Sequence, residues 1–181
     1  YRGKHFLPKT FSNENHVQEI KGVYVPFWLY NGSADAQAEY SATNSRSYTT
    51  STERVTETDH YYVRRCGTMS FENIPADAST KMPDEYMDAV EPFDFSELRP
   101  YSHAYLPGFL ANTWDVAADD NKERVNKRIT ETALNVLYDD VTGYQSVSTD
   151  RSNVDIEHNS AKYAMLPVWM LSTRWNGQSF L

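Results

Sequence analysis

The feature that most constrains the fold is a strict alternation of residue types over 33–43, where the chain reads SADAQAEYSAT. Alanine or tyrosine occupies every even position, and a polar residue occupies almost every odd one. Successive side chains of a β-strand point to opposite faces of the sheet. The pattern therefore predicts a strand with one apolar and one polar face.

A second polar segment follows this strand and predicts a long hairpin. The sequence TNSRS at 43–47 is typical of a turn, and the threonine-rich segment 48–65 favours an extended backbone. We expect a β-hairpin over 33–65 that is polar at its tip and protrudes from the body. Because exposed strand edges recruit other strands, this hairpin is the expected site of partner contact or self-association. The residues expected on that surface are Glu39, Tyr48, Arg54 and Glu57.

Two helices are predicted at very different lengths. Apolar residues at helical spacing predict one long amphipathic helix over about 119–141, packed on a face of the sheet. Asp119 or Asp120 is expected to cap its start and Gly143 to end it. A short helix is expected near 13–21, with Gly22 as its stop. The apolar stripe of the long helix consists of Val125, Ile129, Thr132, Ala133, Val136 and Leu137.

Three similar apolar segments recur along the chain: YVPFWLY at 24–30, YLPGFLA at 105–111 and MLPVWML at 165–171. Proline lacks an N–H and sits at strand starts, edges or bulges. We expect each segment to begin a strand that runs into the core, with the first and last side by side. Their anchors would be Pro26, Trp28, Pro167 and Trp169; the alternative is that Trp28 and Trp169 form an aromatic platform for a ligand.

Strands follow one another without alternating helices, which argues against a doubly wound parallel sheet. The order of elements predicts a single α+β domain over 1–181, built on a mainly antiparallel sheet. The irregular segment 76–102 is expected to hold short helices at 83–90 and 94–99. The remaining predicted strands cover 68–75, 103–115, 144–149, 153–158 and 161–175.

Composition restricts the partners and the compartment. The net charge of −8 makes nucleic-acid binding by this chain unexpected, because phosphates would be repelled. The single cysteine, Cys66, forms no internal disulfide and fits a reducing, cytoplasmic compartment. No apolar run approaches the length of about 20 residues that spans a bilayer. The chain begins at Tyr1 and ends just after a hairpin signal, Asn176-Gly177, so we expect a fragment of a longer protein.

Motifs for catalysis or cofactor binding are missing from the sequence. It has no phosphate-binding glycine loop, no HExxH or CxxC and no GxSxG, and we expect no cofactor in this chain. The richest cluster of reactive types lies within 91–103, where His103 would act as a base oriented by Asp94 or Glu97 in a hydrolase. The alternative is an aromatic plug that covers the sheet. Because no nucleophile accompanies His103, a non-catalytic role is favoured.

The chain resembles the C-terminal part of uncharacterised bacterial proteins with a transcription-factor-IIB-type zinc ribbon, sometimes labelled PriA-type helicases. The resemblance rests on GVYVPFWLY at 22–30, on SFENIPADAS and EPFDFSEL within 68–111, and on YAMLPVWML and WNGQSF within 163–180. It implies a bacterial interaction or structural module of a larger protein, cytoplasmic or membrane-peripheral. Any zinc would be bound outside this sequence, because family members carry their cysteine pairs upstream. The resemblance also leaves a nucleic-acid-associated module as an alternative.

Overall fold

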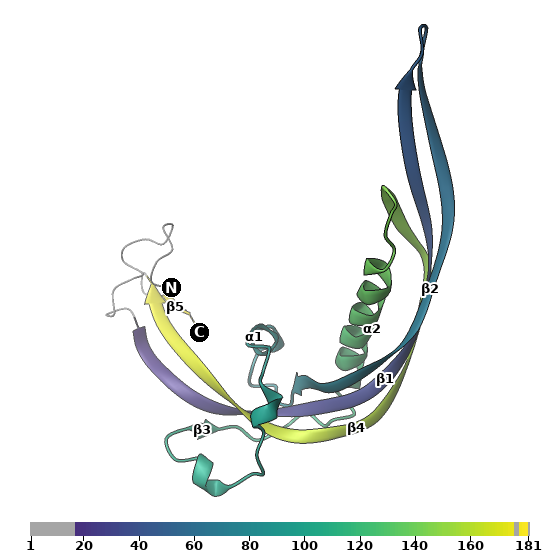
Figure 1. Cartoon of the computed structure of the whole chain (residues 1–181). Coiled ribbons are helices and arrows are strands. Elements are labelled where there is room, and N and C mark those ends of the chain that lie inside the picture. The colour runs from purple at the N-terminus through teal and green to yellow at the C-terminus, as the bar shows by residue number, and fades with distance from the viewer. Residues whose placement is uncertain (1–16, 176–177, 181) are drawn as a thin grey trace. The chain divides into compact units, whose positions relative to one another are not determined.

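The computed structural model describes residues 17–175 and 178–180, with side chains over 20–170. These residues form mostly strands with two α-helices, so the expected α+β class with an antiparallel sheet is confirmed at this level. The strand order is β2-β1-β4-β5, and β3 pairs with β1 (Figure 1). The elements are β1 (Val17–Thr49), β2 (Arg54–Asp77), α1 (Asp84–Ala89), the 3₁₀ turns η3 (Phe95–Glu97) and η4 (His103–Tyr105), β3 (Leu110–Ala111), α2 (Lys122–Asp139), β4 (Ser146–Trp175) and β5 (Gln178–Phe180).

Contacts gather in two compact units, where the sequence predicted a single domain over 1–181. The first, here called the hairpin unit, contains 28–76 and 118–162. The second, here called the loop unit, contains the described residues up to Phe27, 77–117, and those from Tyr163 onward. Strands β1 and β4 contribute residues to both units, and each unit is described by itself.

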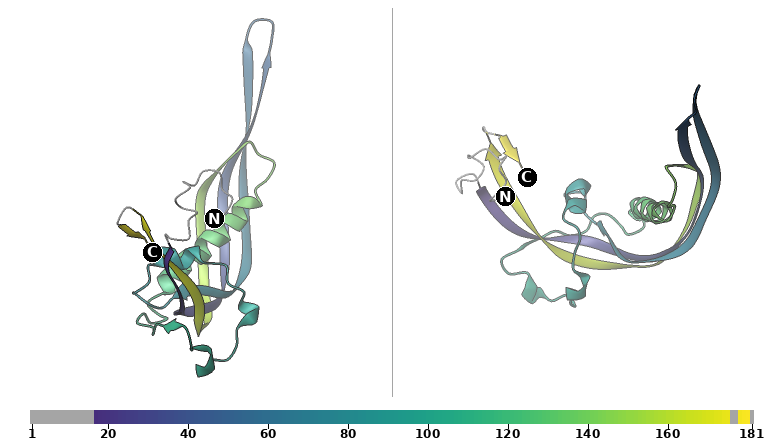
Figure 2. Two further views of the ribbon diagram at one scale, coloured as in Figure 1. Left: turned by 90° about the vertical axis from the view of Figure 1, so that its left-hand side faces the viewer. Right: turned by 45° about the horizontal axis from the view of Figure 1, so that its top comes forward.

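The core of the hairpin unit lies between α2 and one face of the three strands β2, β1 and β4. The even-numbered residues of β1 face this core, and Ala34, Ala36, Ala38 and Ala42 are each at most 2% exposed. The alternation over 33–43 is thereby confirmed. Figure 2 shows α2 lying across that face of the strands. Its buried side chains are Val125, Ile129, Ala133 and Leu137.

Helix α2 falls within the range 119–141, but its ends differ from those expected. Its N-cap residue is Asn121, which makes no side-chain cap bond. Asp119 instead pairs with Lys122, whose Nζ lies 2.6 Å from the carboxylate. The C-cap residue is Asp140, and Gly143, with a φ of 88°, lies beyond it in the loop to β4. The expected caps at Asp119, Asp120 and Gly143 are therefore wrong.

The strands are longer and less interrupted than the sequence suggested. The predicted turn at 43–47 is part of β1, and the hairpin turns later, where the Thr50 N–H donates to the Glu53 carbonyl at 2.8 Å. Segments 54–77 and 146–175 are each one strand rather than several. The turn-forming tendency of 43–47 is overridden here because β2 continues to pair with β1 along this segment.

A bulge in β2 changes which residues face the core. Val63 and Phe71 point toward α2, yet so does Ile74, which breaks the two-residue period. Between them, Asn73 has a φ of 54°, a left-handed conformation that asparagine tolerates better than most residues. The Asn73 N–H donates to the side chain of Asn31 at 2.7 Å, which replaces the lost ladder bond.

The loop unit contains most of the irregular structure. Helix α1 begins after Pro83, within the expected range 83–90. The strand expected over 103–115 is largely wrong, because only Leu110–Ala111 pairs, in parallel, with Val23 and Tyr24 of β1. The short helix expected near 13–21 is also wrong over its described part, since β1 begins at Val17; residues 13–16 lie outside the described residues, as does the turn Asn176-Gly177.

The expected core anchors divide between two environments. Pro26 is fully buried, and Trp28 is half-buried against the core of the hairpin unit. Pro167 and Trp169 are exposed, Trp169 to 68%, so their assignment to the core is wrong. The reason is the alternation of β4, which buries Leu166 and Val168 and turns the residues between them to the other face. Strands β1 and β4 are nevertheless hydrogen-bonded neighbours.

The close approach of α2 to β1 predicts that enlarging Ala133 is costly. Its side chain is fully buried in the cluster that contains Ala36 and Ala38. We expect Ala133→Leu to lower the free energy of unfolding by about 1–3 kcal/mol, because the extra carbons force the helix away. Chemical denaturation measures this change. The matched control, Val136→Leu on the exposed side of the same helix, is expected to change stability little; equal effects would contradict the packing.

The left-handed conformation of Asn73 predicts a graded response to substitution. Glycine adopts a positive φ freely, whereas a β-branched residue does not. We expect Asn73→Gly to keep the melting temperature near that of the wild type. Asn73→Val is expected to cost about 1–2 kcal/mol in thermal or chemical unfolding. If valine were tolerated as well as glycine, the bulge would not be at this residue.

Candidate interaction surface

Beyond the core, β1 and β2 continue as a two-stranded ribbon over 45–58. Figure 1 shows this ribbon extending past the end of α2 and past the start of β4. Its residues face each other in one register: the hydroxyls of Ser45 and Thr58 lie 2.9 Å apart, and those of Ser47 and Thr56 lie 2.8 Å apart. No buried residue lies between 45 and 58, so backbone hydrogen bonds and cross-strand polar pairs hold the ribbon without a buried core.

An ionic cluster occupies the other face of the ribbon. Arg46 donates its Nε–H to the Glu57 carboxylate at 2.6 Å, and the Tyr48 hydroxyl donates to the same carboxylate at 3.0 Å. Hydrogen bonding by Arg46, and then by Tyr48, lowers the pKa of Glu57. Of the four residues expected on the interaction surface, the structure thus brings Tyr48 and Glu57 together. Arg46, which the sequence analysis missed, connects them.

The other two expected residues lie elsewhere on the hairpin. Arg54 is exposed at the start of β2, next to the turn. Glu39 lies on β1 farther from the tip of the hairpin, where it accepts a hydrogen bond from Tyr62 that raises the pKa of the Tyr62 phenol. Pairs such as Arg64 with Gln37, 3.0 Å apart, continue this polar face of the hairpin unit. The surface is therefore an extended ribbon and sheet face rather than a compact patch.

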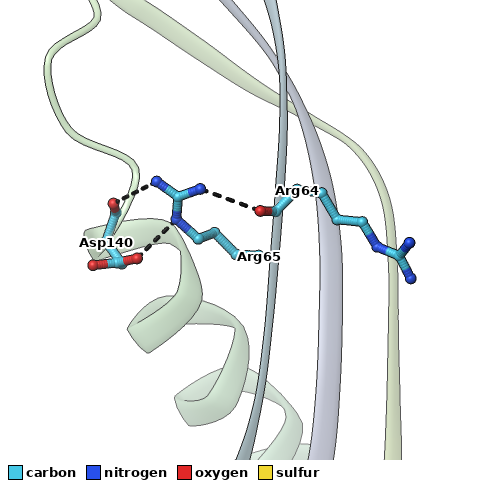
Figure 3. Close-up of polar contacts among 3 residues, drawn as sticks. All are labelled: Arg64, Arg65 and Asp140. Carbon is cyan, nitrogen blue, oxygen red and sulfur yellow. Dashed lines mark hydrogen bonds and ion pairs between the residues drawn. The ribbon is translucent and has the colours of Figure 1, made fainter.

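One contact joins the end of α2 to β2. The Arg65 guanidinium donates to the Asp140 carboxylate at 2.7 Å and to the Asp140 carbonyl at 3.3 Å (Figure 3). It also donates to the carbonyl of Arg64 at 3.1 Å, while the Arg64 side chain points away (Figure 3). Arg65 therefore holds the last turn of the helix against the strand and occupies part of the strand's edge.

The candidate catalytic residues of the loop unit do not converge. Asp94 accepts hydrogen bonds from the backbone and hydroxyl of Ser96, which lowers its pKa and places it at the start of η3. His103 is exposed, and its Nδ1 lies 3.1 Å from the Tyr101 hydroxyl rather than from a carboxylate. Glu97 is exposed within η3. The Glu97 N–H donates to the Asp94 carbonyl at 3.3 Å within η3, and no side-chain contact joins any two of these three residues in the described part of the chain.

Metal binding and disulfide formation find no local support. Over 17–175 and 178–180, no three His, Cys, Asp or Glu side chains lie close enough to hold a metal ion. Cys66 is a free, exposed thiol on β2. A shallow hollow of about 460 Å³ lies beside the base of the ribbon and is lined by residues including Arg46, Asp59 and Tyr144. Neither described helix combines the length and the apolar character that a bilayer crossing demands.

A partly exposed aromatic cluster lies in the loop unit. Trp169 packs on Phe109 with ring centres 5.4 Å apart, and Phe109 packs on Tyr24 at 4.9 Å. A Cβ added to Gly22 would lie 2.5 Å from the Phe109 ring, so glycine is required here for space and not to stop a helix. Trp169, which the sequence analysis had placed in the interior, is the exposed member of this cluster.

A buried polar group lies under α2 in the hairpin unit. The His158 Nε2 lies 2.6 Å from the Asn126 side-chain oxygen, so His158 donates there, while its Nδ1 is buried with no hydrogen-bond partner. The Tyr30 ring packs on His158, and its hydroxyl donates to the Ala118 carbonyl at 2.5 Å. Burial, with Asp119 and Asp120 nearby, raises the pKa of Tyr30 to about 12. Burial, with Lys122 nearby, lowers the pKa of His158 from 6.5.

Comparison with known proteins yields one relative and no assigned activity. The chain is 30% identical over 165 residues to the uncharacterized protein YdjG of Bacillus subtilis (strain 168), an alignment that covers 91% of this chain. The same alignment covers 48% of YdjG, so the chain spans about half the length of this curated relative. No family model matches the sequence, and no solved structure matches it.

The burial of His158 predicts acid sensitivity of the hairpin unit. The folded pKa lies below the unfolded value, so the unfolded state binds more protons between the two. The contribution of His158 to stability is complete above pH 6.5 and is lost as the pH falls below it, toward the folded pKa. We expect His158→Gln, which stays neutral, to flatten the decline in unfolding free energy in this range. The control His103→Gln, on an exposed histidine, should keep the wild-type slope.

Proposed function

We propose that this chain is a non-catalytic interaction module of a larger bacterial protein of the zinc-ribbon type, and that the β1–β2 hairpin makes the contact with its partner. The observation that carries the proposal is the ribbon over 45–58, which extends beyond the core and buries none of its own residues. Ordering such a segment costs conformational entropy that internal burial does not offset. A partner that covers the ribbon supplies the missing burial.

Three further observations support this role. The curated relative is about twice as long as the chain, which leaves room for other parts in the larger protein. The hydrolase alternative is less favoured in this proposal, because the Asp94 side chain caps η3 and the His103 ring contacts the Tyr101 hydroxyl instead of a carboxylate. The net charge of −8 opposes binding to nucleic acid. In this proposal any zinc is bound outside the chain, and the free thiol of Cys66 fits a cytoplasmic location.

The proposal predicts contact at the tip of the hairpin and not at the helix. A photocrosslinking amino acid placed at Tyr48 or Arg54, in the full-length protein expressed in bacteria, is expected to give one discrete adduct. The same label at Glu131, which is exposed on α2, is the matched control and should give none. Equal crosslinking at all three sites would mean that the ribbon has no preferred partner.

A shortened ribbon provides the complementary measurement. Replacing 47–56 by Asn-Gly keeps the Arg46–Glu57 pair and closes the hairpin with a favoured two-residue turn. We expect the melting temperature to stay near the wild-type value, because no buried residue is removed, while partner binding is lost. Full partner binding by this variant, with a label moved to Arg46 or Glu57, would overturn the proposal.

A further inference from the structure

We propose that the partner at this hairpin is a second copy of the same chain, which pairs antiparallel with the free edge of β2 about a twofold axis at Val63. The inference rests on the proposed function, because it names the partner of the same hairpin. It requires that the edge be open, uninterrupted and complementary to itself.

The edge is open because β2 stands at one end of the strand order. The Thr50–Glu53 bond fixes which residues of β2 bond to β1. Hydrogen-bonded pairs recur at every second residue of an antiparallel ladder, so odd residues of β2 face β1 with their backbone groups. Even residues direct their amides and carbonyls outward, and within the described residues no strand pairs with that side.

The edge is uninterrupted over a long stretch. From Arg54 to Glu72 the strand has no proline, and its first left-handed residue is Asn73. Natural sheets protect long edges with bulges, prolines or charges that point at the partner, because an open edge recruits another strand. The midpoint of the uninterrupted stretch is Val63, which places the twofold axis there.

The outward-bonding residues are complementary under this symmetry. An antiparallel copy centred on Val63 sets the positive end of the stretch against its negative end, and hydroxyl residues against hydroxyl residues. Tyr62, which is 67% exposed, meets an arginine. Such cross-strand pairs stabilise a sheet, and no like charges face each other. The facing pairs are Arg54 with Glu72, Thr56 with Ser70, Thr58 with Thr68, His60 with Cys66, and Tyr62 with Arg64.

The contact between Arg65 and the Arg64 carbonyl is compatible with this pairing. That carbonyl lies on the free edge and already accepts one hydrogen bond, at 3.1 Å (Figure 3). A carbonyl oxygen has two lone pairs, so it can also accept from the Tyr62 amide of the second copy. The Arg65–Asp140 contact keeps the Arg65 side chain on the helix side, away from the face where Tyr62 and Arg64 meet.

A disulfide tests the register directly. In this pairing residue 60 faces Cys66 of the second copy, at the Cα separation of about 5.5 Å that suits a disulfide. Within one strand the two positions are about 20 Å apart and cannot bridge. We expect His60→Cys, oxidised with glutathione disulfide, to run at twice the chain mass of 20.8 kDa on non-reducing gels.

Both controls keep Cys66 but place no second thiol opposite it in the proposed register. The wild type places the two Cys66 residues far apart, and Thr58→Cys faces Thr68, so neither should give a disulfide dimer. A disulfide that forms equally well in all three proteins, or in none, would overturn the proposed register.

A charge exchange tests the interface without a covalent bond. Arg54→Glu sets two acidic residues opposite each other at both ends of the dimer, and Glu72→Arg does the same with two arginines. We expect each substitution to raise the dissociation constant of the dimer by roughly tenfold, measured by sedimentation velocity at about 0.15 M salt. The double variant Arg54→Glu with Glu72→Arg should restore it. Both positions are exposed, so the melting temperature reports any effect on the fold.

The shortened ribbon separates this inference from the proposed function. Removal of 47–56 deletes the tip contacts but keeps the central pairs from Thr58 to Thr68. With the label moved to Arg46 of the shortened ribbon, loss of the adduct together with a reduced yield of the His60→Cys disulfide supports both ideas. A monomeric wild type that still forms a Tyr48 adduct of another mass refutes the dimer alone, and a disulfide dimer without any tip adduct refutes the tip contact alone.

Discussion

Packing of α2 on the alanines of β1 is the interaction on which the hairpin unit depends. Small side chains at Ala34, Ala36 and Ala38 allow the helix to approach the strand closely, and Ala133 meets them from the helix. In packing this dense, either a larger or a smaller residue lowers the stability. The bonds at its margins, from Tyr30 to the Ala118 carbonyl and from Arg128 to the Pro75 carbonyl, hold the helix in one position along the strands.

Among the described residues of the hairpin unit, the opposite side of the strands carries no helix, and this side carries the polar pairs. Residues of β1 and β2 such as Asp35 and Thr68 bond across the strands and fill their hydrogen-bonding capacity without burial. A surface built in this way presents polar groups to water, and a regular backbone edge lies beside it. The unit therefore combines a packed apolar core with a polar face and an unpaired strand edge.

The alternation over 33–43 revealed a strand and its buried face directly, because a two-residue period has no helical equivalent. Local signals failed where tertiary pairing decided the outcome. The turn-like residues at 43–47 are inside a strand because β2 pairs with them and extends past them. Trp169 looked like a core residue because its segment is apolar on both faces, and only the fold reveals which face is covered. The positive φ of Asn73 had no recognisable signature, since asparagine is common in loops.

The candidate site was predictable as a region but not in detail. The threonine-rich composition indicated an exposed hairpin, and Tyr48 and Glu57 do meet within it. Which residue pairs with Arg46 depends on the position of the turn. The sequence analysis placed that turn at 43–47, which includes Arg46, so it could not name Glu57 as the partner of Arg46. The predicted cluster within 91–103 was misjudged because Asp94 and His103 are close in sequence, whereas short 3₁₀ turns direct their side chains to different neighbours.

The repeated hydroxyl residues of the ribbon have a consequence for its alignment. A slip of the two strands by two positions would still set one serine against a threonine, because polar strands specify their offset weakly. The Glu57 carboxylate favours the observed offset, since there Arg46 and Tyr48 reach it together. One acidic side chain thus helps to fix the register of two polar strands.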